Sequence, residues 1–99
     1  MAKYMVLWEV DTSRTPEDPK TKKSQHLAAQ EVVMKNLREG AIKEWGCFAG
    51  QWSGYLIFEG TAVELHTLVG TWIPFSKCRQ VSEVISIDDV DKSTKALPE

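Results

Sequence analysis

Basic residues are not in excess in this sequence of 99 residues. It has 12 Lys and Arg against 14 Asp and Glu, which leaves a formal net charge of -2 at pH 7. Proteins that bind nucleic acid or anionic membranes non-specifically usually present a basic face. The sequence also lacks any run close to the roughly 20 apolar residues of a membrane-spanning helix. We therefore expect neither nucleic acid nor a membrane as a partner.

Cysteine is scarce as well: the sequence has two, Cys47 and Cys78, with no Cys-x-x-Cys spacing. Secreted scaffolds of this length usually carry four or more, and the N-terminus shows no apolar run of signal-peptide length. A cytoplasmic protein with two reduced thiols is expected. A metal site built from His26, His66 and a cysteine would have to join three separate segments without a spacing signature, so we expect no metal and no cofactor.

The sequence is well supplied with large apolar side chains, including four Trp, which favours an ordered fold. Residues 3–10 are nearly all apolar or aromatic, and this pattern predicts a buried central strand. Residues 55–58 are equally apolar on both faces and predict a second one. We expect an edge strand within 41–49, a hairpin loop bounded by glycines at 50–54 and a last strand at 77–87.

Two helices are indicated by their end signals. The first is predicted to start with Asp18 as N-cap and Pro19 at the first helical position, and to end near Glu39 before Gly40. A start at Thr15 would also form a capping box with Asp18, but it places Pro19 inside the first turn, where Asp18 would be disfavoured as helix.

A capping box at 61–64 opens the second predicted helix, whose apolar stripe includes Leu65 and Trp72 and which Pro74 ends. The order strand, helix, strand, strand, helix, strand predicts a ferredoxin-like α+β fold with an antiparallel four-stranded sheet in the order 4-1-3-2. We expect a single domain over residues 1–90, followed by a polar C-terminal tail at 91–99. The polar stretch from Asp88 onward is compatible with one helical turn and carries no core.

In such a fold both helices cover the same face of the sheet. The other face would then show either Met5 and Leu7 or the alternate residues of the first strand, together with one apolar set from the third strand. An exposed apolar patch of several hundred Å² is more than monomers usually tolerate. A homodimer that pairs the two sheets face to face is the simplest consequence.

Three segments of the sequence resemble an uncharacterised prokaryotic family of the dimeric α+β barrel superfamily. They are 3–10, Gly40-x-Ile42-x-x-Trp45-Gly46 and Gly54-Tyr55-x-x-x-Glu59-Gly60, and the resemblance extends over residues 3–90. It implies a ferredoxin-like protomer that dimerises through its sheet, but it brings no established activity. The superfamily includes muconolactone isomerases, cofactor-independent monooxygenases and ligand-sensing modules, which share a ligand cleft between sheet and helices. No catalytic motif of those enzymes matches this sequence.

His26 and Gln30 are the leading candidates for a ligand site, because both fall within the apolar stripe of the first helix. There they would face the sheet, where Trp8, Tyr4 and Tyr55 are candidates for the wall of a small pocket. His26 could act as a general base or hold a substrate oxygen. The alternative is that His26 lies half solvated at the rim and is inert.

Other polar residues are assigned structural roles. Glu9 and Glu59 end the two central strands, and Lys77 and Arg79 are candidate ion-pair partners; His66 is expected at the surface.

Two hypotheses of function remain. The first is a small-molecule site in a homodimer, which includes isomerase or cofactor-independent monooxygenase activity. The second is a non-catalytic interaction or ligand-sensing module. An RNA-recognition module shares the topology but needs further aromatic and basic residues near Tyr55, which this sequence lacks.

Overall fold

The computed structural model describes residues 2–14, 16–72 and 75–98, which form an α+β structure with one four-stranded antiparallel sheet and three α-helices. This confirms the predicted class. In chain order the elements are β1 Ala2–Val10, a short 3₁₀ turn η1 Thr12–Arg14, α1 Pro19–Arg38, β2 Glu44–Cys47, β3 Ser53–Gly60, α2 Ala62–Gly70, β4 Ser76–Val84 and α3 Ile87–Lys95.

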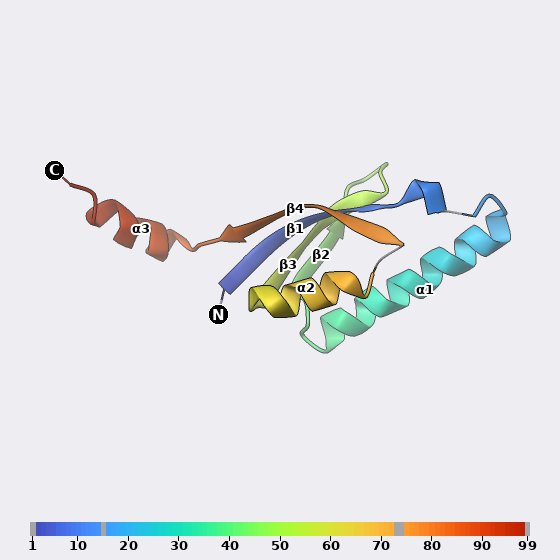
Figure 1. The fold of residues 1–99 in the computed structure, drawn as a ribbon, viewed down its shortest axis with the longest axis horizontal. Coiled ribbons are helices and arrows are strands. Elements are labelled where there is room, and N and C mark those ends of the chain that lie inside the picture. The colour runs from blue at the N-terminus through green and yellow to red at the C-terminus, as the bar shows by residue number, and fades with distance from the viewer. Residues whose placement is uncertain (1, 15, 73–74, 99) are drawn as a thin grey trace.

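The strand order across the sheet is β2-β3-β1-β4, which counted from the β4 edge reads β4-β1-β3-β2. The two most apolar strands, β1 and β3, therefore occupy the centre, as their sequences predicted. They pair antiparallel with Val6 opposite Leu56. Both α1 and α2 lie on the same side of the sheet (Figure 1), an arrangement compatible with a ferredoxin-like fold.

Local capping sets the ends of α1. The Asp18 carboxylate accepts a hydrogen bond from the Thr21 backbone N–H at 2.9 Å, and Pro19 is the first helical residue. At the other end Gly40 has φ 76°, the left-handed conformation that glycine adopts without strain. The later of the two predicted starts is confirmed.

The capping box of α2 is also confirmed. The Glu64 N–H donates to Thr61 Oγ1 at 3.1 Å, and the Thr61 N–H donates to Glu64 Oε1 at 2.9 Å. The helix ends at Gly70, so Trp72 lies beyond it and not on its stripe. Pro74, the predicted helix terminator, lies outside the described residues.

Two predicted boundaries are corrected. Ser53 and Gly54 belong to β3 and not to the hairpin loop, because Gly54 pairs with both Trp8 and Cys47. The last strand ends at Val84 and not near Ile87, because Ser86 caps a further helix by accepting a hydrogen bond from the Asp89 N–H at 3.2 Å. That helix, α3, runs across residue 90, where the sequence placed the start of a polar tail.

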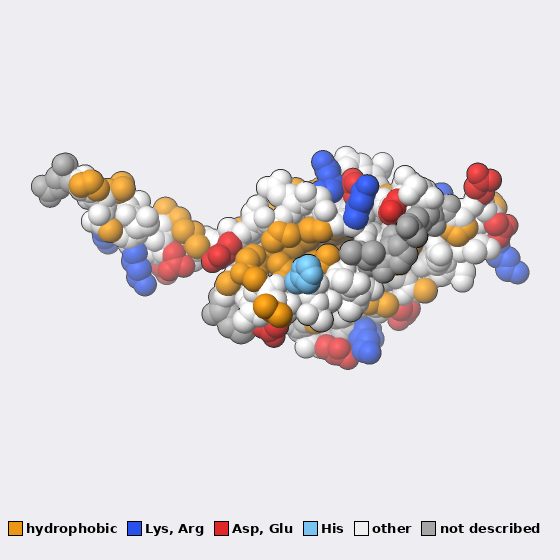
Figure 2. Space-filling model, viewed as in Figure 1, with side chains coloured by type: hydrophobic (Ala, Val, Ile, Leu, Met, Phe, Trp, Pro, Cys, Tyr) orange, Lys and Arg blue, Asp and Glu red, His pale blue; other side chains and the backbone are white. Residues whose placement is uncertain are grey.

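The third helix projects from the body of the protein (Figure 1). The molecule measures 62 Å along its long axis and has a radius of gyration of 16.5 Å, against about 13 Å for a compact chain of this length. Hydrophobic side chains lie exposed on α3 (Figure 2), among them Ile87 at 79% and Val90 at 42% exposure. The C-terminal segment is therefore an amphipathic arm: its helix of nine residues is longer than the single turn expected, and its polar stretch carries the exposed Ile87 and Val90.

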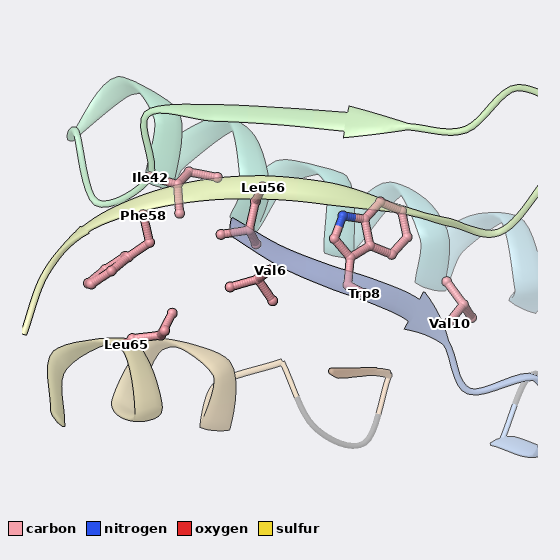
Figure 3. Packing of buried hydrophobic residues seen from close by; sticks show 7 residues of the cluster. All are labelled: Val6, Trp8, Val10, Ile42, Leu56, Phe58 and Leu65. Carbon is pink, nitrogen blue, oxygen red and sulfur yellow. The ribbon is translucent and has the colours of Figure 1, made fainter. Parts of the chain in front are cut away.

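The buried core lies on the side of the sheet that the helices cover (Figure 3). It consists of residues from β1, β3, the α1–β2 connection and α2, namely Val6, Trp8, Val10, Ile42, Leu56, Phe58 and Leu65. Alternate residues of β1 and β3 thus face the helices, while Met5, Leu7, Tyr55 and Ile57 face the open side. No residue of α1 belongs to this apolar core, and His26 is the one buried residue of that helix.

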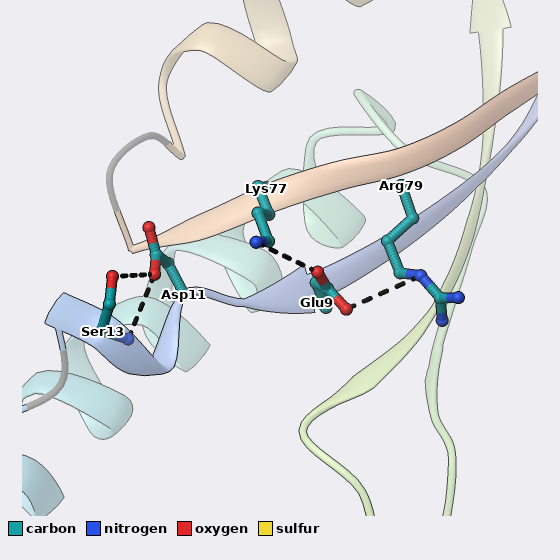
Figure 4. Close-up of polar contacts among 5 residues, drawn as sticks. All are labelled: Glu9, Asp11, Ser13, Lys77 and Arg79. Atoms are coloured by element: carbon teal, nitrogen blue, oxygen red, sulfur yellow. Dashed lines mark hydrogen bonds and ion pairs between the residues drawn. The ribbon is translucent and has the colours of Figure 1, made fainter.

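Ion pairs tie the strand ends together at the open face. Glu9 lies 3.3 Å from Lys77 Nζ and 3.6 Å from Arg79 Nε (Figure 4), and Lys3 Nζ lies 3.6 Å from Glu59. The predicted structural role of the two glutamates agrees with these three ion pairs, all of which form within one chain. In the described part of the chain, no helix has the length and apolar character needed to cross a membrane.

Candidate functional site

A cavity of about 520 Å³ separates α1 from the sheet. We call it the aromatic cleft, because all four tryptophans of the chain line it. Its walls come from β1, β2, the β2–β3 hairpin, α1 and the α2–β4 connection, and are formed by Trp8, Val10, His26, Ala29, Gln30, Val32, Val33, Met34, Leu37, Trp45, Cys47, Trp52, Thr71, Trp72, Phe75 and Ser76. Its volume falls within the range of small-molecule sites.

One wall of the cleft is a pair of stacked indoles. The rings of Trp8 and Trp45 lie 5.0 Å apart with an interplanar angle of 14°, although β3 separates their strands. Trp8 can reach across β3 because the residue opposite it is Gly54, where a Cβ atom would lie 2.7 Å from the indole. Trp8 Nε1 donates a hydrogen bond to the Tyr55 carbonyl oxygen at 3.1 Å, which holds the ring in place.

The opposite end of the cleft holds His26 between two aromatic rings. Its imidazole lies 4.5 Å from the Trp52 ring and 5.1 Å, edge to face, from Phe75. Backbone hydrogen bonds hold both neighbours against β1, since the Val10 N–H donates to Trp52 O and the Asp11 N–H donates to Phe75 O, each at 2.9 Å. His26 is only 9% exposed, so it is not the half-solvated rim residue of the alternative interpretation.

Polar atoms without partners occur among the residues that line the cleft. His26 Nε2 and Trp72 Nε1 are buried and make no hydrogen bond within the described residues. A buried polar group left without a partner costs about 1–3 kcal/mol. Gln30 lies one helical turn after His26 and is exposed where it lines the cleft. The cleft therefore combines apolar walls with a few polar groups, as ligand sites do.

The environment of His26 favours the neutral imidazole. Burial lowers the pKa of His26 below its ordinary value of 6.5, and the positive charge of Lys22 lowers it further. The unfolded chain then binds a proton at a higher pH than the folded one, so stability falls as the pH falls. The contribution of neutral His26 to the free energy of unfolding is complete above about pH 6.5. It is lost as the pH drops through the pKa of folded His26.

We expect His26→Gln to lose less stability than the parent protein between about pH 8 and about pH 5, the range in which histidine titrates. Urea denaturation across this range measures the difference. His66→Gln is the matched control, because His66 is exposed on α2 and its replacement leaves the parent profile unchanged. If the parent protein and His26→Gln lost the same stability between these pH values, the loss would not come from protonation of His26.

The structure brings three of the five candidate ligand residues together. His26, Gln30 and Trp8 all line the aromatic cleft. Tyr4 faces the same side but packs against the core and is not among the lining residues. Tyr55 points to the opposite face of the sheet, where its hydroxyl donates to Glu44 Oε1 at 2.6 Å, and this hydrogen bond raises the pKa of Tyr55.

Trp45, Trp52, Trp72 and Phe75 also line the cleft, and none of them was among the five candidate ligand residues. For Trp45 a sequence signal was available. Trp45 and Cys47 are two residues apart on β2, and alternate residues of a strand lie on the same face of the sheet. Nothing in the local sequence of the other three indicates the cleft, because their placement depends on how the hairpin and the α2–β4 connection meet α1.

The remaining candidates lie apart from the cleft or make other contacts. His66 is exposed, as predicted. Cys47 lines the cleft, whereas Cys78 lies on the opposite edge strand, and both are free thiols; burial raises the pKa of Cys78. Across the described ranges, no group of three or more His, Cys, Asp or Glu side chains is placed to hold a metal ion.

Comparison with known proteins adds no family assignment to this geometry. No protein-family model matches the chain, and no curated protein matches it either.

Proposed function

We propose that this protein binds a small organic molecule in the aromatic cleft. The observation that carries the proposal is the position of the apolar stripe of α1. This stripe is centred on Val33 and Leu37. Val33 packs against the core, whereas Met34 and Leu37 line the cavity and remain 43% and 37% exposed, as does Val32 beside the stripe at 44%. A helix that covers a sheet normally buries such a stripe in the core, so here the space that core side chains would fill is available to a ligand.

The polar content of the cleft favours binding or sensing over catalysis. Among the described lining residues, His26 is the one side chain whose ordinary pKa lies near neutrality, and no Asp, Glu, Lys or Arg is present to act with it. An isomerase needs a proton donor and acceptor in the right places. Isomerase and cofactor-independent monooxygenase activities are therefore second to a non-catalytic, ligand-sensing role.

Two neighbouring alanines of α1 test the site. Ala29 lines the cleft, and Ala28 is exposed and does not. Saturation-transfer NMR with a mixed set of aliphatic, aromatic, neutral and charged compounds should find at least one that binds the parent protein. We expect Ala29→Trp to fill the cleft and weaken that binding by about tenfold or more, while Ala28→Trp retains it. Equal binding by both variants, or no binding by the parent protein, would contradict the proposal.

We further propose that the protein is a homodimer that pairs its open sheet faces, as in dimeric α+β barrels. Support comes from the side chains at the centre of that face: Met5 is 39% exposed, and Leu7 and Ile57 are partly exposed. The ion pairs of Glu9 and Glu59 lie toward its ends. An apolar centre with a polar rim is typical of protein interfaces.

The relationship to the dimeric α+β barrel superfamily and the cytoplasmic location stay predictions from the sequence.

A further inference from the structure

The aromatic cleft is free of formal charge, although charged residues make up 26% of the chain. None of its described lining residues is Asp, Glu, Lys or Arg, and burial, which lowers the pKa of His26, favours the neutral imidazole. Lys22 acts on His26 from outside the lining. An ion that entered the cleft would therefore lose its hydration without direct contact with an oppositely charged lining residue. The composition of the walls thus selects against charged ligands.

The shape of the walls selects for flat ligands. The rings of Trp8 and Trp45 stack on each other with an inclination of 14°. Because Trp8 is only 6% exposed, the pair meets the cleft chiefly through the half-buried Trp45 ring. Trp52 and Phe75 add further ring surfaces beside His26. Aromatic rings gain more from offset stacking and edge-to-face contacts with another ring than from contact with an aliphatic group of the same area.

The polar atoms in the walls call for oxygen on the ligand. Trp72 Nε1 is a donor only and has no partner in the described part of the chain. A hydroxyl or carbonyl oxygen would satisfy it, and a hydroxyl group could also pair with His26 Nε2 or with the Gln30 amide. Each of these residues lines the cleft.

From these three features we infer that the ligand of the aromatic cleft is an uncharged, flat aromatic compound that carries a hydroxyl or carbonyl oxygen. This inference rests on the proposed small-molecule function and names its ligand class. It assigns the Trp45 indole, held in place by its stacking on Trp8, to ring recognition, and Trp72 Nε1 to recognition of the oxygen.

Three matched probes test the ligand class on the full chain at neutral pH. 2-Naphthol is flat, aromatic and uncharged; decahydro-2-naphthol has the same hydroxyl on a saturated frame; and 2-naphthoate has the same rings with a negative charge. Isothermal titration calorimetry gives the three dissociation constants. We expect 2-naphthol to bind about tenfold more tightly than the saturated alcohol and about a hundredfold more tightly than the carboxylate.

The Trp72→Phe variant tests the recognition of oxygen, since it retains an aromatic ring and removes the indole N–H. We expect its affinity for 2-naphthol to fall by about fivefold. Its affinity for decahydro-2-naphthol should fall by the same factor, because the two compounds carry the same hydroxyl group. An unchanged affinity would overturn the role of Trp72 Nε1.

The outcomes separate the ligand class from the proposed function. If the saturated alcohol or the carboxylate binds as tightly as 2-naphthol, the class is wrong while a small-molecule site stands. If none of the three binds but another compound of the mixed set does, and Ala29→Trp abolishes that binding, the class is again overturned and the function is retained. If no compound of the mixed set or of this series binds, both fail.

Discussion

Replacing Gly54 by alanine is expected to destabilise the protein by about 3 kcal/mol or more. A Cβ atom at this position would overlap the Gly46 carbonyl oxygen and would lie 2.7 Å from the Trp8 ring and 2.9 Å from Cys47 Cα. Two of these three neighbours are backbone atoms that sheet pairing holds in place, so a side-chain rotation cannot relieve the clash. Native domains are stable by only about 5–15 kcal/mol, and a large part of that margin would be lost.

Thermal unfolding measures this effect, and near-UV circular dichroism reports whether the Trp8 and Trp45 rings remain stacked. For a chain of this size we expect the Tm to fall by roughly 10–20 °C. Gly70→Ala is the matched control, because a Cβ atom at Gly70 meets nothing within 4 Å. That change should raise the stability by about 0.5–1 kcal/mol. A Gly54→Ala protein with the parent Tm and spectrum would show that the close packing across β3 is not required.

Replacing Leu7 by glutamate is expected to convert the proposed dimer into monomers. Leu7 lies on the central strand of the open face, opposite Tyr55, where a face-to-face partner would bury it. An unpaired buried charge costs several kcal/mol, and each 1.4 kcal/mol is tenfold in affinity, so the Kd of the dimer should rise by about a hundredfold or more.

Analytical ultracentrifugation of the full chain over a range of concentrations gives the mass and the Kd. Val63→Glu is the control, because Val63 is 76% exposed on α2, away from the open face, and its replacement should leave the mass unchanged. A monomeric parent protein would overturn the sheet-to-sheet dimer, and so would a Leu7→Glu variant that still dimerises with the parent affinity. Neither result would affect the cleft, which lies on the helix side of the sheet.

Local sequence signals predicted the elements well where the signals act within a few residues. Asp18 with Pro19, and Thr61 with Glu64, cap their helices by hydrogen bonds that span three residues. The continuous apolar character of β1 and β3 placed both strands at the centre of the sheet, because only a central strand is covered on both edges. The C-terminal arm was missed because Ser86 initiates a helix soon after β4 ends, and α3 has only two large apolar residues, Ile87 and Val90, too few to indicate a helical period in the sequence.

The candidate site was predicted only in part. His26 and Gln30 could be placed in the cleft because the helical period orients both toward the sheet. The strand period left open which face of β1 the helices cover, so Trp8 was one of three aromatic candidates, and the structure places it in the cleft. The assignment of Tyr55 to the same pocket depended on strand parity, and the observed register places it on the other face. Trp52, Trp72 and Phe75 lie in loops or at element ends, where no period applies.

The sequence by itself determined the strands, the helix caps, the central position of β1 and β3, and the polar residues on the inner face of α1, since each depends on contacts between residues close together in the chain or on simple periodicity. Only the tertiary structure decided that α1 stands away from the sheet, that Trp8 crosses Gly54 to stack on Trp45, and that four tryptophans enclose one cleft. These features depend on the register between strands and on the distance between layers. Both are set by the packing of side chains from distant parts of the chain, which no local pattern encodes.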